Sequence, residues 1–276
     1  MANGKNGALR GLFQLRVAPS PTIAKLLGLG TVALLLLFWW LATRGATPET
    51  RLISPVILPS PFEVFRSFPS LWNERGLPAS IAATLQRVLL GFGLAALVGV
   101  PLGILAGSWR MLDAASAPLA IFGRNIPVAA LIPLTILWFG IEETQKVMFL
   151  FVACVPFVFT GAVNAITSVP DRYVETAQTL GASQWQIVTK VLIALALPGI
   201  YSTLRSLFGM AFGYIMLAEL INAEHGLGYL LSTSQRRGLS EHIILILFII
   251  GLIAFLIDRF LMWMQRGLFP HLTETE

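Results

Sequence analysis

The sequence predicts an all-α integral membrane protein with about six transmembrane helices. Hydrophobic residues make up 56% of the 276-residue chain and charged residues only 12%, and the mean hydropathy is +0.77. Soluble domains are about 25% charged. Several apolar runs are long enough to cross a bilayer, and one polar stretch, residues 168–190, interrupts them. The expected organisation is one helical membrane domain embedded in the lipid bilayer.

The basic residues indicate how the chain crosses the membrane. They are scattered, without a basic helix face, so the net charge of +5 is not read as a nucleic-acid-binding surface and no nucleic-acid partner is expected. Lys5, Arg10, Arg16 and Lys25 precede the first apolar run, and no acidic residue occurs before Glu49. By the positive-inside rule, residues 1–25 are expected to form a cytoplasmic tail. After six spans, residues 267–276 form a second cytoplasmic tail.

The first span is predicted at residues 26–43. This run is longer than the core of a usual signal peptide and lacks a nearby A-x-A site, so it is read as an uncleaved helix. The proline-rich residues 44–80 are expected to form an external loop. Three prolines exclude a long helix there, although a short helix can begin at Pro61. The transmembrane core then covers residues 81–266.

The second span, residues 81–107, carries small side chains at every fourth position. They are Gly91, Ala95, Gly99, Gly103 and Gly107. Such a ridge permits close helix approach in a bilayer, where packing rather than the hydrophobic effect drives association. The ridge is interpreted as a packing surface within the chain, with a contact between two copies as the alternative.

The third apolar stretch, residues 114–140, is interrupted in its middle. Arg124 and Asn125 stand there, shortly before Pro127. A charge at this depth is costly unless it faces a cavity or a partner, and broken helices often line transport pathways. The alternative is that Arg124 extends its side chain to the membrane interface.

The last three spans are predicted at residues 147–167, 191–221 and 242–264. Cys154, the one cysteine, is expected to be a small buried side chain in the first of them. The second contains Arg205 and Glu219, which are about 21 Å apart along one helix and cannot pair directly. Each needs water in a cavity or a partner elsewhere, and an ion pair between Arg205 and the Glu219 of another helix or protomer is one possibility.

The polar stretch, residues 168–190, has the pattern of two short helices. Pro170 suits the first turn of one helix and Gly181 its end, and Ser183 with Gln186 forms a capping box for the next. The predicted topology places this stretch in the cytoplasm. A cytoplasmic loop that contains its own capped helices is typical of a docking element, the alternative being a helical loop without a partner.

These residues resemble a known family. Glu175-Thr176-Ala177, followed by Gly181 and Leu197-Pro198, is similar to the EAA signature of binding-protein-dependent ABC transporter permeases. The stretches LPSP at 58–61, IPLTILWFGI at 132–141 and LGAS at 180–183 resemble the sulfonate, nitrate and taurine branch of that family. The resemblance spans residues 53–266.

The resemblance implies the permease fold of a type I ABC importer. It implies a dimer of permease protomers, with a homodimer as the default, two cytoplasmic ATP-binding subunits and an extracytoplasmic solute-binding protein. In this family the EAA region forms coupling helices that insert into a cleft on each ATPase. The coupling residues implied here are Glu175, Thr176, Ala177, Leu180, Gly181 and Ala182.

A translocation pathway is also implied by the resemblance. Its expected residues are Arg124, Asn125, Pro127, Leu131, Arg205, Phe212 and Glu219. The segment 124–131 lacks two prolines and the tryptophan of the R-P-x-P-P-L-A-W pattern of relatives, and Phe212 replaces a tryptophan that is common in the fifth helix. These departures leave the identity of the solute open.

The expected function is import of a small anionic solute, of the sulfonate, taurine, nitrate or bicarbonate type, across a prokaryotic inner membrane. ATP and Mg²⁺ are expected in the partner ATPase subunits and no cofactor in this chain, which has no G-x-x-x-x-G-K-[ST] phosphate loop. Its isolated histidines give no sign of a catalytic or metal site. Two alternatives stay open: an ion-coupled secondary transporter, and a permease of the same branch for a neutral or cationic metabolite.

Overall fold

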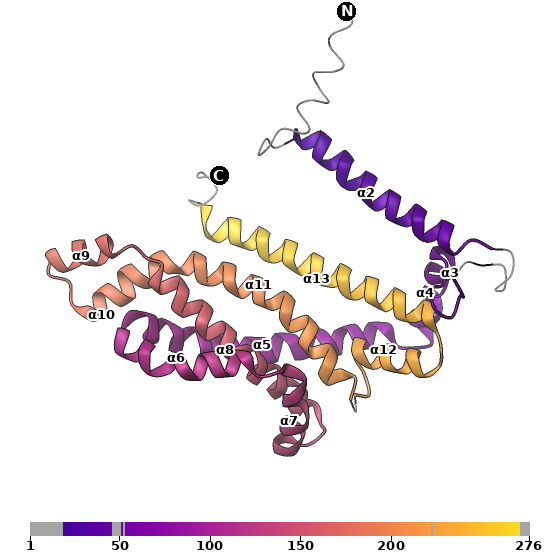
Figure 1. Ribbon diagram of the computed structural model, residues 1–276. Coiled ribbons are helices and arrows are strands. Elements are labelled where there is room, and N and C mark those ends of the chain that lie inside the picture. The colour runs from indigo at the N-terminus through magenta and orange to yellow at the C-terminus, as the bar shows by residue number, and fades with distance from the viewer. Residues whose placement is uncertain (1–18, 46–50, 52, 222, 271–276) are drawn as a thin grey trace, which may run out of the picture. The chain divides into compact units, whose positions relative to one another are not determined.

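The computed structural model describes residues 19–45, 51, 53–221 and 223–270, which form helices without any strand (Figure 1). The chain divides into two compact units, residues 1–67 and 68–276. Of the predicted cytoplasmic tails, residues 1–18 and 271–276 lie outside the described residues.

The first unit contains one long apolar helix and one short capped helix. Helix α2 (Pro21–Ala42) has Ser20 as its N-cap and Pro21 in its first turn, which explains why it begins five residues before the predicted position. Helix α3 (Pro61–Arg66) begins at the predicted proline. Its capping box joins Ser60 and Glu63, and Glu63 also binds Arg51, with 2.9 Å between Oε1 and Nη2.

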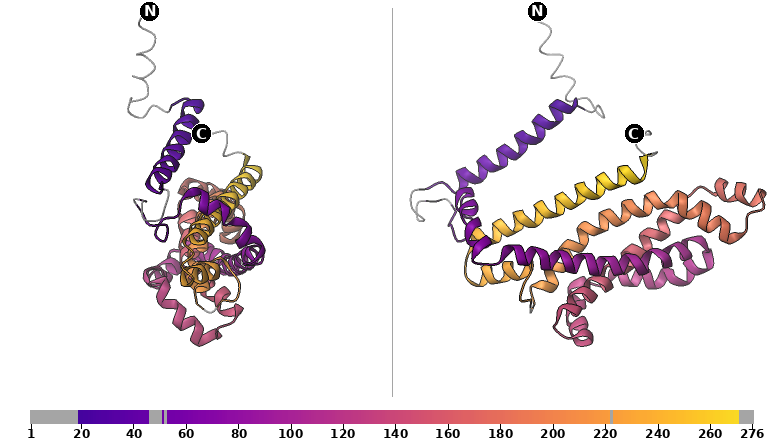
Figure 2. Two further views of the ribbon diagram at one scale, coloured as in Figure 1. Left: turned by 90° about the vertical axis from the view of Figure 1, so that its right-hand side faces the viewer. Right: turned by 180° about the vertical axis from the view of Figure 1, so that it is seen from behind.

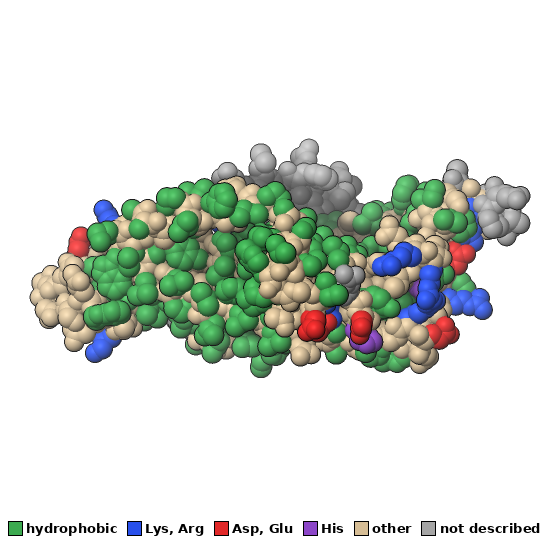
Figure 3. Space-filling view, turned by 90° about the horizontal axis from the view of Figure 1, so that it is seen from below, with side chains coloured by type: hydrophobic (Ala, Val, Ile, Leu, Met, Phe, Trp, Pro, Cys, Tyr) green, Lys and Arg blue, Asp and Glu red, His purple; other side chains and the backbone are tan. Residues whose placement is uncertain are grey.

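The second unit is built around four long helices, which run along its length in Figure 1 and in the right-hand view of Figure 2. They are α5 (Leu77–Ser108), α8 (Glu143–Thr167), α11 (Ile193–Glu219) and α13 (Ser240–Leu268). With α2, the described residues contain five helices long and apolar enough to cross a membrane, or six if a bent pair counts as one span. Hydrophobic side chains cover most of the face in Figure 3, and charged side chains gather towards its two ends. The prediction of about six spans is confirmed.

The ridge of small residues on α5 packs against α8. A Cβ atom added to Gly103 would lie 2.6 Å from the Phe159 carbonyl oxygen, and one added to Gly91 would lie 2.8 Å from that of Val147. Gly99 and Gly107 face α8 in the same way. The predicted packing surface is therefore confirmed, and it lies within one chain.

The interrupted span is sharply bent. Helix α6 (Arg110–Asn125) and the segment formed by the 3₁₀ turn η2 (Val128–Ala130) and α7 (Leu131–Phe139) meet at an angle of 88°. Pro127 lies in the break, and the residue before it, Ile126, is extended, as sterics require of a residue that precedes proline. The predicted break near Arg124 is confirmed.

Short helices occupy the two ends of the second unit (Figure 1). One end carries α9 (Asp171–Thr179) and α10 (Gln184–Ile187), which continues through the π-helical turn η3 (Val188–Leu192) into α11. The other end carries α4 (Phe68–Asn73) and α12 (Leu227–Arg236). Helices α8 and α13 begin before the predicted spans because polar residues such as Glu143 and Ser240 continue the helix beyond the apolar run.

Candidate functional site

The α9–α10 segment, residues 171–187, is a tight turn between two capped helices. Helix α9 ends in a Schellman motif: the N–H of Ala182 donates to the carbonyl of Ala177 at 3.0 Å, and that of Gly181 to Gln178 at 2.9 Å. Gly181 has φ +77°, in the left-handed region that favours glycine. Both bonds of the predicted capping box between Ser183 and Gln186 are present. Pro170 precedes α9 as its cap residue instead of standing in its first turn.

The turn presents an apolar tip beside a carboxylate. The Leu180 side chain, directly before Gly181, is 81% exposed. Glu175 and Thr176 are also exposed, and no ion pair is found for Glu175 within the described ranges. Ala177 and Ala182 are half-buried. This arrangement can bind a surface that offers an apolar pocket and a nearby cation.

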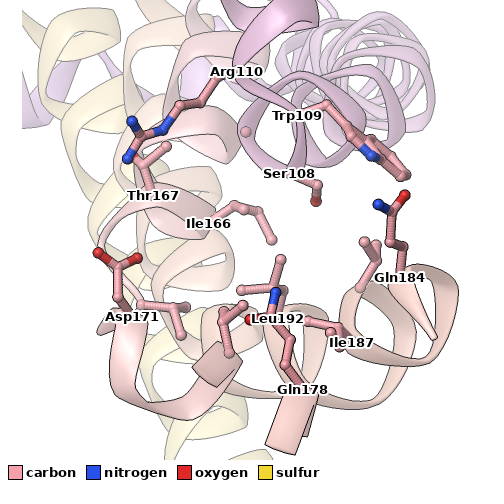
Figure 4. A pocket seen from close by; sticks show the side chains of 14 residues that line it. Ser108, Trp109, Arg110, Ile166, Thr167, Asp171, Gln178, Gln184, Ile187 and Leu192 are labelled. Carbon is pink, nitrogen blue, oxygen red and sulfur yellow. The ribbon is translucent and has the colours of Figure 1, made fainter. Parts of the chain in front are cut away.

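A buried apolar cluster fixes the base of the α9–α10 segment to the membrane helices. It contains residues of the end of α8, of the α8–α9 junction, of α10, of η3 and of α11: Ala165, Ile166, Val169, Ile187, Val188, Leu192, Ala196 and Ile200. Beside it lies a cavity of about 390 Å³, between the α5–α6 junction, the end of α8 and the α9–α10 segment. Trp109 and Gln184 face each other on one side of this cavity, and Arg110 lies near Thr167 on the other (Figure 4).

The charged group at the bend of the interrupted span is accessible. Arg124 and Asn125 are exposed at the end of α6, and Pro127 is exposed in the break. The Asn125 amide donates to the carbonyl of Ile121 at 2.8 Å. Among the described residues no ion pair is found for Arg124. Leu131, in contrast, is 7% exposed and belongs to the main apolar core.

Arg205 has an acidic partner on another helix of the same chain. Its Nε lies 2.9 Å from Oδ1 of Asp258 in α13, and its Nη1 donates to Gln265 at 3.0 Å. The pairing of Arg205 with Glu219, which the sequence left open, is therefore not what the structure shows. The sequence carried a signal for this partner, since Asp258 is the one acid of the predicted span 242–264.

Glu219 is buried at the end of α11, where three donors surround its carboxylate. It accepts hydrogen bonds from Arg87 at 2.7 Å, from Thr84 at 2.8 Å and from the N–H of Gly228 at 2.9 Å. Its residue exposure is 1%, so it does not line an open passage in this chain. The carboxylate joins α11 to α5 and α12, and the placement of Glu219 on the translocation pathway stays a prediction.

Arg87, which sequence reasoning missed, is the centre of this network. It is 3% exposed and makes two bonds of 2.6 Å to Glu143 of α8, in addition to its bonds to Glu219 and to the carbonyl of His225. A buried arginine needs such partners because an unpaired charge in the interior is costly. Its position as an arginine inside the predicted span 81–107 was the signal in the sequence that could have identified it.

Phe212 is also placed in the interior. It is 2% exposed, and its ring centroid lies 6.0 Å from that of Phe208, which contacts Phe92 of α5 edge-on. Core side chains enclose Phe212 in the single chain, and its place on the passage stays a prediction. Of the predicted pathway residues, only Arg124, Asn125 and Pro127 are exposed together.

Residues 99–274 match the family described as the binding-protein-dependent transport system inner membrane component. Among curated relatives, the chain is 32% identical over 249 residues to the taurine transport system permease protein TauC of Escherichia coli, covering 88% of this chain and 89% of the relative. It is 29% identical over 249 residues to the nitrate import permease protein NrtB of Synechocystis, covering 87% of each. It is 30% identical over 194 residues to the bicarbonate transport system permease protein CmpB of Synechococcus elongatus, covering 70% of each.

The fold is similar to solved structures of two transporters. One is a chain of the MetNI methionine ABC transporter in an inward-facing conformation, with a TM-score of 0.65 and 23% identity, covering 72% of this chain and 97% of that chain. The other is from a bacterial ABC transporter involved in the import of alginate, with a TM-score of 0.54 and 16% identity, covering 89% and 95%. At these identities the likeness concerns the fold alone.

Proposed function

Because the chain belongs to the family of binding-protein-dependent transport system inner membrane components, we propose that it is the transmembrane permease subunit of an ATP-driven importer. The multi-pass helical unit supplies the membrane passage. The family is one of transport permeases, and we assign ATP hydrolysis to separate subunits that hold ATP and Mg²⁺, with no cofactor in this chain.

The observation that carries the proposal is the exposed, rigid tip of the α9–α10 segment. Leu180 at this tip is the proposed apolar anchor in a cleft of the ATPase, and Glu175 the acceptor for a basic residue of that subunit. Gly181 holds the turn, while Thr176, Ala177 and Ala182 keep the adjoining surface small. The Schellman motif and the capping box make the tip stiff enough to transmit a displacement.

The proposed assembly has two copies of this chain, two ATP-binding subunits on the cytoplasmic side and a solute-binding protein outside. A closed two-fold dimer is the commonest oligomer, which supports a homodimer. Both termini are assigned to the cytoplasm of a prokaryotic cell from the basic residues that precede the first span. ATP binding draws the two α9–α10 segments together and reorients the dimer, and hydrolysis resets it.

The proposed solute is a small anion. Arg124 is exposed at the bend between α6 and α7, and we assign it to the pathway together with Asn125 and Pro127. Arg205 is a weaker candidate because Asp258 already neutralises it. The names of the relatives refer to taurine, nitrate and bicarbonate, each of which carries an anionic group, and they support a solute with such a group over a cationic one.

The test is purification followed by reconstitution. We expect the chain to copurify with ATPase subunits, and proteoliposomes that also receive the solute-binding protein to take up taurine, nitrate or bicarbonate only when ATP is supplied. A Leu180→Asp variant should no longer bind the ATPase subunits, because it removes the proposed apolar anchor. Leu180 makes no buried contact, so the fold should not be disturbed. Uptake driven by an ion gradient in the absence of ATPase subunits would contradict the proposal and support a secondary transporter.

A further inference from the structure

We propose that Trp185 of α10 and Trp109 at the α5–α6 junction form the contact through which movement of the α9–α10 segment reaches α6. The inference rests on the proposed function, since an ATPase must move the segment. The two rings meet edge to face, with centroids 5.4 Å apart and planes at 73°. Aromatic pairs prefer an edge-to-face or offset arrangement, so a displacement of one ring favours a matching displacement of its partner.

Trp109 is placed to pass a displacement into two helices. Its backbone N–H donates to the carbonyl of Leu105 at the end of α5. Its backbone carbonyl accepts hydrogen bonds from the N–H groups of Leu112 at 2.9 Å and Asp113 at 3.1 Å, in the first turn of α6. Helix α5 packs closely against α8 along the glycine ridge, for example at Gly107. Helix α6, which is less firmly held, is therefore the element that responds.

Trp185 lies on the moving side of the contact. It is 61% exposed, so burial does not hold its ring in place. Shortly after it, the chain passes through the π-helical turn η3, Val188–Leu192. Such turns are rare in proteins as a whole, and those that occur are often found at functional sites. The widened turn can shift the register of the helix on one side relative to the helix on the other. This turn allows α10 to shift while α11 stays in the membrane.

The cavity that Trp109 lines makes the contact between the two rings important. This cavity, of about 390 Å³, lies between the α5–α6 junction and α9. Arg110, Asp171 and Gln178 line it (Figure 4). Helix α9 therefore does not press on α6 across this space. The tryptophan pair and the apolar cluster below it carry the displacement instead.

Helix α6 leads from this contact to the proposed anion site. It has 16 residues, about 24 Å in length, and ends with Arg124 and Asn125 at the 88° bend. A shift at Trp109 thus moves the base of the helix that carries Arg124. The tryptophans are positioning residues, which act on the passage without touching the solute.

The test measures the movement of α6 directly, so that no solute is needed. The permease, with Cys154→Ala and Leu119→Cys, is assembled with its ATPase subunits in nanodiscs and spin-labelled at the α6 position, which is exposed. The distance between the two copies is measured by pulsed electron paramagnetic resonance before and after addition of ATP, Mg²⁺ and vanadate. ATP hydrolysis is measured on the same samples.

We expect Trp185→Ala and Trp109→Ala to reduce the fraction of complexes that show the ATP-dependent distance by about 3- to 10-fold, the range of an aromatic edge-to-face contact. ATP hydrolysis should remain within about twofold of the unaltered complex, and the double variant should be no worse than either single variant, since both remove one contact. Trp185→Phe should restore the shift, because a phenyl ring keeps an edge-to-face contact. Trp263→Ala is the matched control, since Trp263 is 70% exposed in α13 and its ring stacks on Phe260 of the same helix.

An undiminished shift in both alanine variants would overturn the inference, and so would a double variant whose loss is the product of the two single losses. Failure of the proposed function looks different: the unaltered chain would then recruit no ATPase and show no ATP-dependent distance at all.

Discussion

Arg87 of α5 and Glu219 of α11 form a buried ion pair, with 2.7 Å between Nη1 and Oε1, although they are 132 residues apart in the sequence. Both side chains are almost fully enclosed, and Thr84 and Gly228 supply further hydrogen bonds to the carboxylate. The pair fixes the end of α11 to α5 and to the start of α12. It therefore holds one end of the helical unit together, at the end opposite α9 and α10 (Figure 1).

Loss of the Glu219 carboxylate should destabilise the protein. Glu219→Ala leaves Arg87 buried with Glu143 as its remaining acid, and removal of one partner of a buried pair costs about 3 kcal/mol. The measurement is thermal unfolding of the purified chain in detergent. Glu224→Gln, on the exposed loop nearby, is the control and should have no effect. An altered solute KM with unchanged stability would instead support the placement of Glu219 on the translocation pathway.

The glycine ridge should tolerate no side chain where it meets α8. Gly103→Ala places a Cβ 2.6 Å from the Phe159 carbonyl oxygen, and overpacking of this kind costs about 1–3 kcal/mol. Gly93→Ala is the matched control on the same helix, because no atom lies within 4 Å of the added Cβ and alanine favours the helix. Equal unfolding temperatures for the two variants would show that α5 and α8 do not pack closely in the membrane.

The charge at the bend should determine affinity for an anion. We expect Arg124→Gln to raise the KM for uptake about 10- to 100-fold, the value of a charge-assisted hydrogen bond, with protein stability unchanged. Arg205→Gln should mainly lower stability, because it leaves Asp258 without its partner. The measurement is uptake by proteoliposomes over a range of taurine, nitrate or bicarbonate concentrations. The reverse pattern, with affinity following Arg205, would contradict the assignment.

The left-handed residue of the α9–α10 turn should be required for coupling. Gly181→Val forces a β-branched residue to φ +77°, at a cost of about 1–2 kcal/mol, and should distort the tip that carries Leu180. Gly181→Asn is the control, because asparagine adopts this conformation more readily. Uptake per ATP hydrolysed should fall in the valine variant and stay near normal in the asparagine variant. Unchanged uptake in both would remove the turn from the coupling mechanism.

The stabilisation that Glu63 gives to the N-terminal cap of α3 should depend on pH. The hydrogen bond from Arg51 is the main cause that lowers the pKa of Glu63 from its ordinary 4.5 to about 2. A lowered folded pKa means that this carboxylate stabilises the fold above about pH 4.5 and loses its contribution as the pH falls through about 2. Titration of a ¹³C-labelled Glu63 carboxyl by nuclear magnetic resonance measures it. In Arg51→Gln the midpoint should rise towards 4.5, and an unchanged midpoint would exclude the arginine as the cause.

The sequence by itself determined the features that depend on neighbours along the chain. Apolar runs gave the spans, Pro61 the start of α3, and Gly181 with Ser183 and Gln186 the turn between α9 and α10. The break near Arg124 was equally local, since a proline restricts the residue before it. Each of these is set by backbone hydrogen bonds or sterics within a few residues, so it can be read from a short window of sequence.

Only the tertiary structure decided which groups meet across helices. The sequence offered Glu219 as a partner for Arg205, whereas packing gave Arg205 to Asp258 and Glu219 to Arg87. It also enclosed Phe212, which had been expected on the passage. The physical reason is that the rotation of each helix about its axis decides which side chains face inward. That rotation is fixed by the packing of all helices together, as at the glycine ridge of α5, and by no single stretch of the chain.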